Sequence, residues 1–235
     1  MYRNTRLRIF CYEYSGRGVV IAEKRKVANL MALAVLATIV ARPMHRYEMA
    51  SMMRARGKDR DMDIKWGSLY TVVQNLERNG YLEPIGVTRQ GARPERTVYQ
   101  ITDAGRDELV AWTRELIAQP EAEHTRFIAG LSVLAVLTPD DVTDLLGRRL
   151  ERLRKTSDAL RSELEEASDV PRLFLIEDEY RIAMTRAEAD WTGSLLDELS
   201  TGTFPHLDAW RRWHENGDIP SEFTELAERG AEHNQ

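Results

Sequence analysis

Residues 65–102 of this 235-residue chain read KWGSLYTVVQNLERNGYLEPIGVTRQGARPERTVYQIT. The first part predicts a helix over about residues 67–79, because four apolar residues recur at the i, i+3, i+4 and i+7 spacing of one buried helix face. Ser68 is a candidate N-cap for this helix, and Asn79 followed by Gly80 is typical of a helix end. The four apolar residues are Leu69, Val72, Val73 and Leu76.

The opposite face of this helix carries short polar side chains, a tyrosine on its flank and one arginine. Such groups can pair with base edges in the major groove of DNA and can also contact phosphates. Lys65 and Ser68, at the start of the helix, are placed to hold the DNA backbone. Taken alone, the pattern also suits an ordinary helix with a solvated polar face. The predicted groove-facing residues are Tyr70, Thr71, Gln74, Asn75 and Arg78.

Two runs rich in β-branched and aromatic residues follow, at residues 81–88 and 96–102, and they predict the strands of a hairpin. Three arginines gather at its tip against a single acid. An exposed loop of this charge favours the DNA backbone or the adjacent minor groove, with a solvated charged turn as the alternative. Together, the helix and the basic hairpin predict a winged helix-turn-helix. The three arginines are Arg89, Arg93 and Arg96, and the acid is Glu95.

The charge of the chain is divided unevenly between its two halves. Residues 1–118 hold 20 Lys and Arg against 13 Asp and Glu, a net of +7. Residues 119–235 hold 13 against 25, a net of −12, and the two halves sum to the formal charge of −5. A basic half joined to an acidic half is the pattern expected when only the first half faces nucleic acid.

Three stretches resemble the PadR family of bacterial transcriptional regulators: NLMALAVLATIVARPMHRYEMA at residues 29–50, GSLYTVVQNLERNGYLEP at 67–84 and RPERTVYQITDAGRDEL at 93–109. They contain the elements G-[ST]-[LV]-Y, L-E-x-x-G and Y-x-[IL]-T-x-x-G, which are fairly specific when they occur together in this order. The resemblance covers residues 29–109 closely and the C-terminal half only through its helical pattern and one tryptophan. At Arg46 the family usually has a glycine that opens the second helix. Arg46 either adds a phosphate contact or is tolerated on the helix surface, and both interpretations stay open.

The resemblance implies a winged helix-turn-helix followed by a helical domain that dimerises. A two-fold homodimer is also expected on physical grounds, because one short helix reads too few bases and a dimer sets half-sites near one helical turn apart, ~34 Å. Family members often act as repressors and release DNA when a small aromatic or hydrophobic effector binds. Some place a tryptophan of the fourth helix at the dimer interface, and Trp112 is the matching effector-binding candidate. The competing interpretation is that Trp112 packs within its own domain.

The fold expected is therefore mainly α with a small β wing, in a winged helix-turn-helix domain plus an all-α C-terminal dimerisation domain. Four segments are predicted: a basic N-terminal extension at residues 1–26, the DNA-binding domain at 27–119, the helical dimerisation domain at 120–200 and a C-terminal tail at 201–235. The tail is expected to be variable or partly disordered, with Trp210 and Trp213 as candidate anchors. Within the second segment, helices are expected over about 27–41, 45–56 and 103–118, and 57–65 is expected to be a polar connection. In the C-terminal half, helices are expected over about 121–137, 139–167 and from 171 onward. The basic extension is either a DNA-contacting arm or a segment outside the family domain.

The sequence offers little support for an enzyme or a membrane protein. No phosphate loop, dinucleotide fingerprint, zinc-protease motif or nucleophile elbow is present, so no catalytic residue, metal or cofactor is expected. The single cysteine, Cys11, excludes an intramolecular disulfide framework and suits a reducing cytoplasm. The apolar run from Leu30 to Ala41 is too short to span a bilayer and is not followed by a cleavage site.

Two functions of different classes fit these observations. The first is a cytoplasmic, sequence-specific DNA-binding regulator, acting as a repressor on a double-stranded operator and released by an effector. The second is a helical protein-interaction module without specific DNA binding. The salt dependence of duplex binding separates them, since it is steep for a regulator and flat for a scaffold. The sequence names no effector, operator or regulated gene.

Overall fold

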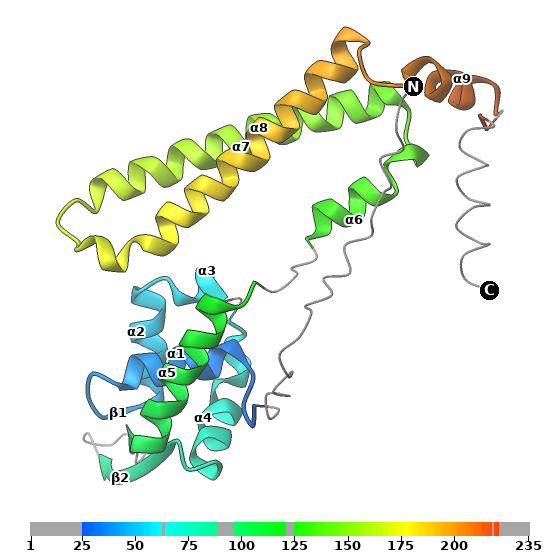
Figure 1. Cartoon of the computed structure of the whole chain (residues 1–235). Helices are drawn as coiled ribbons and strands as arrows, with labels where there is room; N and C mark the ends of the chain where they lie inside the picture. The colour runs from blue at the N-terminus through cyan, green and yellow to red at the C-terminus, as the bar shows by residue number, and fades with distance from the viewer. Residues whose placement is uncertain (1–24, 63, 89–95, 121–124, 218, 221–235) are drawn as a thin grey trace, which may run out of the picture. The chain divides into compact units, whose positions relative to one another are not determined.

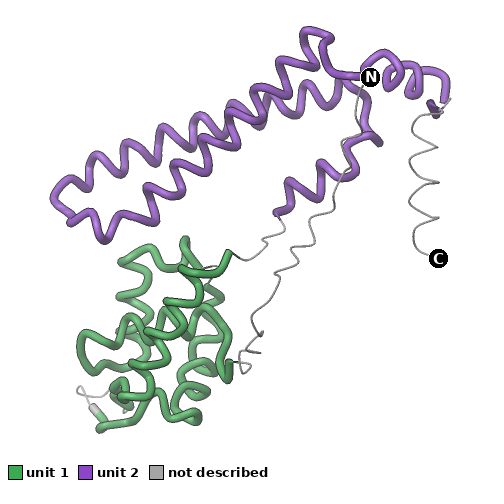
Figure 2. The backbone as a smooth tube through the Cα atoms, in the orientation of Figure 1, with its two compact units in different colours: residues 1–120 green, residues 121–235 purple. Residues whose placement is uncertain are grey.

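The computed structural model describes residues 25–62, 64–88, 96–120, 125–217 and 219–220 (Figure 1). The chain divides into two compact units, shown in separate colours in Figure 2. Each unit has its own cluster of buried apolar residues. The units span residues 1–120 and residues 121–235.

The first unit combines helices with a small antiparallel sheet of strand order β1-β3-β2. Strand β1 is a two-residue segment that the sequence did not predict, and its Met44 pairs with Tyr99 of β3. The wing strands β2 and β3 pair with each other, as predicted, with an irregularity between Pro84 and Gly86. The elements are α1 (Leu30–Ile39), β1 (Met44–His45), α2 (Arg46–Ala55), α3 (Lys58–Met62), η1 (Trp66–Ser68), α4 (Leu69–Arg78), β2 (Leu82–Thr88), β3 (Arg96–Ile101) and α5 (Asp103–Ala118).

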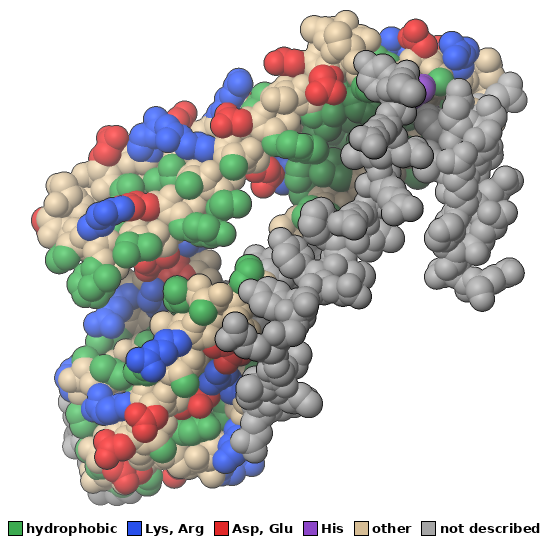
Figure 3. Space-filling view, in the orientation of Figure 1, with side chains coloured by type: hydrophobic (Ala, Val, Ile, Leu, Met, Phe, Trp, Pro, Cys, Tyr) green, Lys and Arg blue, Asp and Glu red, His purple; other side chains and the backbone are tan. Residues whose placement is uncertain are grey.

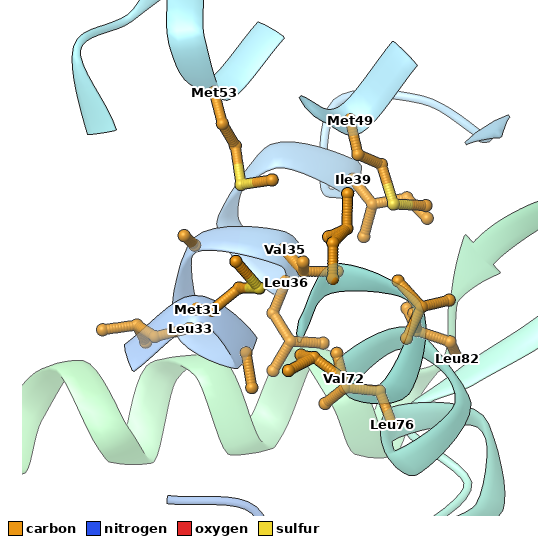
Figure 4. Packing of buried hydrophobic residues seen from close by; sticks show 14 of the residues in the cluster. Met31, Leu33, Val35, Leu36, Ile39, Met49, Met53, Val72, Leu76 and Leu82 are labelled. Carbon is orange, nitrogen blue, oxygen red and sulfur yellow. The ribbon is translucent and has the colours of Figure 1, made fainter. Parts of the chain in front are cut away.

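The core of the first unit is built around α1. This helix is apolar on nearly every side, and most of its side chains are buried, as expected of a helix surrounded by other elements. It contacts α2, α4, α5 and β3. Figure 4 shows Leu36 and Ile39 of α1 among side chains from neighbouring elements, including Val72 and Leu76 of α4 and Met49 of α2. Helix α4 is therefore held by the four-residue apolar face that its spacing predicts, and all four residues are buried.

Ser68 occupies the N-cap position of α4, as predicted, but its side chain does not cap the helix, because its hydroxyl donates to the Lys65 carbonyl at 2.9 Å within the short turn η1. Another local prediction was wrong. The stretch expected to be a polar connection contains the helix α3. This helix follows Gly57, whose φ of +64° lies in the left-handed region, and it carries an ion pair between Lys58 and Asp61 at 2.9 Å. A five-residue polar helix has no apolar periodicity that a sequence could reveal.

The second unit is helical. Helices α7 and α8 pack along each other as an antiparallel hairpin (Figure 1). The predicted start of α7 is present, because the Thr138 hydroxyl accepts from the Asp141 backbone N–H at 3.1 Å and Pro139 occupies the first turn. The elements are α6 (Arg126–Ser132), η2 (Leu134–Val136), α7 (Pro139–Glu166), η3 (Arg172–Phe174), α8 (Ile176–Thr201) and α9 (Leu207–Asn216).

The tail from residue 201, which was expected to be variable or partly disordered, contains the helix α9. Leu207 and Trp210, one helical turn apart, are both buried in the core of the second unit. The Trp210 indole N–H donates to the Leu137 carbonyl at 3.0 Å, which ties α9 to the segment before α7. Trp210 therefore anchors this segment, as the sequence suggested, whereas the glycine, proline and charge of the region gave no sign of the short amphipathic helix that carries it.

Gly105 provides a test of the packing between α5 and the wing. A Cβ at this position would lie 2.2 Å from the Tyr81 carbonyl oxygen and 2.9 Å from the Ile101 side chain. We therefore expect Gly105→Ala to destabilise the first unit by about 1–3 kcal/mol or more, because backbone must move to make room. Urea unfolding, followed by circular dichroism, measures the change.

Gly147→Ala in α7 is the matched control. No atom lies within 4 Å of a Cβ placed there, so this substitution should stabilise its helix by roughly 0.5–1 kcal/mol. A Gly105→Ala protein with the wild-type unfolding midpoint would contradict the close approach of α5 to Tyr81.

Candidate nucleic-acid interface

The exposed face of α4 is set by its buried face. With Leu69, Val72, Val73 and Leu76 in the core, the remaining positions of the helix must point outward. Tyr70 is 54% exposed. Thr71 and Arg78 are also exposed, and Gln74 and Asn75 are partly exposed. The structure thus brings the five predicted groove-facing residues onto one helix surface.

Hydrogen bonds between neighbouring residues arrange the side chains on this face. The Gln74 amide Nε2 donates to the Tyr70 hydroxyl at 2.9 Å, one helical turn away. The Arg78 guanidinium donates to the Asn75 amide oxygen. These bonds leave further donors and acceptors on the two amides, since a carboxamide offers two N–H donors and two acceptor lone pairs.

Cations surround this polar face. Lys65 is exposed just before η1, and Arg46 at the start of α2 is partly exposed. Within the described part of the chain, neither of them nor Arg78 forms an ion pair with a carboxylate. Because an anion would offset their unpaired charge, the surface is suited to phosphate.

Arg46 and Tyr47 also belong to this surface. The sequence left open whether Arg46 contacts phosphate, and it did not identify Tyr47 as a site residue. The guanidinium carbon of Arg46 lies 4.1 Å from the ring centroid of Tyr70. Tyr47, which is 68% exposed, lies under Arg96 of the wing, with 4.9 Å between the guanidinium carbon and the ring centroid. The signal that could have found Tyr47 is its position next to Arg46, where the sequence departs from the family pattern.

The wing contributes Arg96 at the start of β3, where it pairs with Thr88 of β2 in the sheet. Arg89 and Arg93, the other two predicted wing contacts, lie outside the described residues. Behind the wing, burial raises the pKa of Tyr99, and the Glu77 carboxylate raises it further while Arg46 lowers it. Tyr99 therefore stays a neutral phenol at physiological pH and supports the sheet as a buried side chain.

Trp112, the predicted effector contact, is enclosed within its own unit. The indole is 4% exposed and belongs to the core around α1. The Arg25 guanidinium lies over its ring at 4.8 Å and forms ion pairs with Glu108 and Glu115 on the same helix. A compound could stack on that ring face only after displacing Arg25, so the geometry favours the packing interpretation.

No cluster of three or more His, Cys, Asp or Glu side chains is close enough to coordinate a metal ion within the described ranges. None of the helices in that part of the chain has both the length and the apolar character that crossing a membrane requires.

Comparison with known proteins shows which family model and which solved structures the chain is similar to. Residues 35–111 match the model of the transcriptional regulator PadR-like family. The structure of Bacillus subtilis PadR in complex with operator DNA has 19% sequence identity and a TM-score of 0.60, covering 72% of this chain and 99% of that one. The same protein in complex with p-coumaric acid has 17% identity and a TM-score of 0.59, covering 73% and 99%. The Vibrio cholerae virulence activator AphA has 20% identity and a TM-score of 0.52, covering 73% and 98%. No curated protein sequence matches the chain.

The matched region includes all of α4, the two wing strands and most of α5. The similar structures share both the winged helix-turn-helix and the long helices that follow it, which confirms the predicted fold class. The family consists of DNA-binding regulators and not of enzymes. The family match over residues 35–111 and the shared fold thus identify the first unit as a PadR-like winged helix-turn-helix domain, of the kind found in transcriptional regulators.

Proposed function

We propose that this protein binds a double-stranded operator as a homodimer and acts as a repressor. The observation that carries the proposal is the prearranged polar face of α4, bordered by unpaired cations. In this proposal Tyr70, Thr71, Gln74, Asn75 and Arg78 face the major groove. The DNA backbone or the adjacent minor groove is held by Lys65, Ser68 and Arg96, together with Arg89 and Arg93 from outside the described residues.

Release by a small aromatic or hydrophobic compound is part of the proposal. It is supported by the similar fold of Bacillus subtilis PadR, which has been captured both with operator DNA and with p-coumaric acid. The fold also serves a virulence activator, so the sign of regulation needs its own test. A reporter gene behind the selected operator should be silenced by the protein and restored by an active compound, whereas expression that rises with the protein would show an activator.

Gln74→Ala tests base reading by α4. A bidentate amide contact discriminates between bases by about 1–3 kcal/mol, or roughly 5- to 150-fold. We expect the variant to lose that preference between a selected operator and a duplex changed at one base pair, while its non-specific affinity stays largely intact. Fluorescence anisotropy with labelled duplexes at several salt concentrations measures both quantities.

Lys65→Ala is the comparison for this test. Loss of a phosphate contact should weaken binding to all duplexes alike and lower the slope of log affinity against log salt by about one. Equal losses on every duplex for Gln74→Ala would contradict its role in reading bases.

The homodimer is proposed to form through the second unit, which exposes large apolar side chains at the end where α7 turns into α8. Phe174 is 65% exposed, and Leu173, Ile176 and Tyr180 beside it are also exposed. Figure 3 shows hydrophobic side chains on the surface of this hairpin. Toward the other end of α7, a groove of about 470 Å³ lies between α6 and α7. Its lining includes six leucines, Phe127 and Val142, together with three arginines of α7.

A two-fold axis across the hairpin would place the exposed turn of one copy against the groove of the other. Both contacts then occur twice, because an isologous interface repeats every pair. Each copy would in this way cover an apolar surface that it exposes when alone.

Phe174→Asp tests this interface. Removing a buried phenylalanine costs about 1.5–3 kcal/mol, and two-fold symmetry doubles that cost to about 3–6 kcal/mol. We expect the dimer dissociation constant to rise roughly 100-fold or more in sedimentation velocity experiments without DNA. Val87→Asp, at an exposed wing position, should leave the dimer unchanged. A dimer that tolerates Phe174→Asp would place the interface elsewhere.

A further inference from the structure

The start of α2 and the exposed face of α4 are linked by a chain of two side-chain contacts. Arg46 is the first residue of α2, at a position where the family pattern has glycine. Its guanidinium carbon lies 4.1 Å from the Tyr70 ring centroid. The Tyr70 hydroxyl in turn accepts from the Gln74 amide at 2.9 Å. A residue that departs from the family pattern thus contacts the predicted base-reading helix.

These contacts constrain a side chain that would otherwise be mobile. Tyr70 is 54% exposed, and an exposed tyrosine exchanges between rotamers. The planar guanidinium holds the ring face, because cations are attracted to aromatic faces and arginine also stacks on them. With the ring held, its hydroxyl fixes one edge of the Gln74 amide. The amide oxygen and a second N–H remain available for a ligand.

The free amide edge matches one base. A glutamine that donates one N–H and accepts one hydrogen bond pairs with the N7 and N6 atoms of adenine in the major groove. We propose that Arg46 is a positioning residue that acts through Tyr70 to aim Gln74 at an adenine. This inference rests on the proposed function, since it requires that α4 reads DNA.

A direct phosphate contact by Arg46 is the competing explanation, and the two differ in measurable ways. A phosphate contact needs only positive charge, so lysine could replace arginine, and removing the charge would lower the salt slope by about one. Positioning needs the planar guanidinium, which lysine lacks. It also depends on the Tyr70 hydroxyl, which carries no charge.

The experiment compares variants of the full-length protein on two duplexes. The first duplex is the operator that the wild-type protein selects from a random pool. The second duplex differs at one base pair: the A·T pair for which the Gln74→Ala variant loses its preference is replaced by G·C. The variants are Arg46→Lys, Arg46→Ala and Tyr70→Phe. Arg54→Lys is the control. Arg54 lies at the other end of α2 and also stacks on an aromatic ring, with its guanidinium carbon 4.1 Å from the ring centroid of Trp66. Anisotropy titrations give the affinity ratio, and thermal unfolding verifies each fold.

We expect the wild-type protein and Arg54→Lys to prefer the A·T duplex by roughly 10-fold or more. Arg46→Lys, Arg46→Ala and Tyr70→Phe should reduce this preference below about 3-fold, with Arg46→Lys keeping the wild-type salt slope. The double variant Arg46→Ala/Gln74→Ala should prefer the A·T duplex no less than Gln74→Ala alone does, because the two residues act as one unit. Tyr70→Phe removes only an exposed hydroxyl, so it tests the contact between Tyr70 and Gln74 even if an Arg46 variant unfolds.

Wild-type discrimination by Arg46→Lys or by Tyr70→Phe would overturn the positioning role, and so would an equal loss in Arg54→Lys. Failure of the proposed function has a different signature. In that case Gln74→Ala itself would retain full discrimination at every base pair, whereas failure of the inference alone leaves Gln74→Ala defective and the Arg46 variants normal.

Discussion

Burial of one face of α4 against α1 and α2 sets the orientation of the surface on which the function depends. Leu69, Val72, Val73 and Leu76 belong to the same core as the apolar helix α1. A helix anchored by a full stripe cannot rotate about its axis without exposing that stripe to water, at a cost of about 0.8 kcal/mol per CH₂. The polar face is therefore presented in one fixed orientation. Its hydrogen bonds and the Arg46 stack then refine individual side chains on a rigid support.

The wing is tied to the same body by close backbone contacts. The Thr102 hydroxyl donates to the Gly80 carbonyl at 2.6 Å and accepts from the Gly105 N–H at 3.0 Å. One side chain thus joins the end of α4, the end of β3 and the first turn of α5. The T-x-x-G element of the sequence has a physical cause here, since Gly105 leaves room for the Tyr81 carbonyl. The relation between recognition helix and wing depends on this junction.

Much of this arrangement could be predicted because it follows from apolar periodicity and strong capping residues. The stripe of α4, the paired wing strands and the start of α7 at Thr138 all have such local signals. The features that were missed lack them. Strand β1 has two residues and exists only through its pairing with β3. Helix α9 is held by the buried Trp210, whose indole N–H donates to the carbonyl of Leu137, far away in the sequence. The stack of Arg46 on Tyr70 joins two helices, so no spacing within one helix could reveal it.

Sequencing the duplexes that the purified protein retains from a random pool would test most directly whether this surface reads DNA as a two-fold dimer. A dimer that presents two copies of α4 should enrich a palindromic motif with half-sites about one helical turn, ~34 Å, apart. Retention of duplexes without a shared motif, or of a single asymmetric half-site, would contradict sequence reading by paired α4 helices.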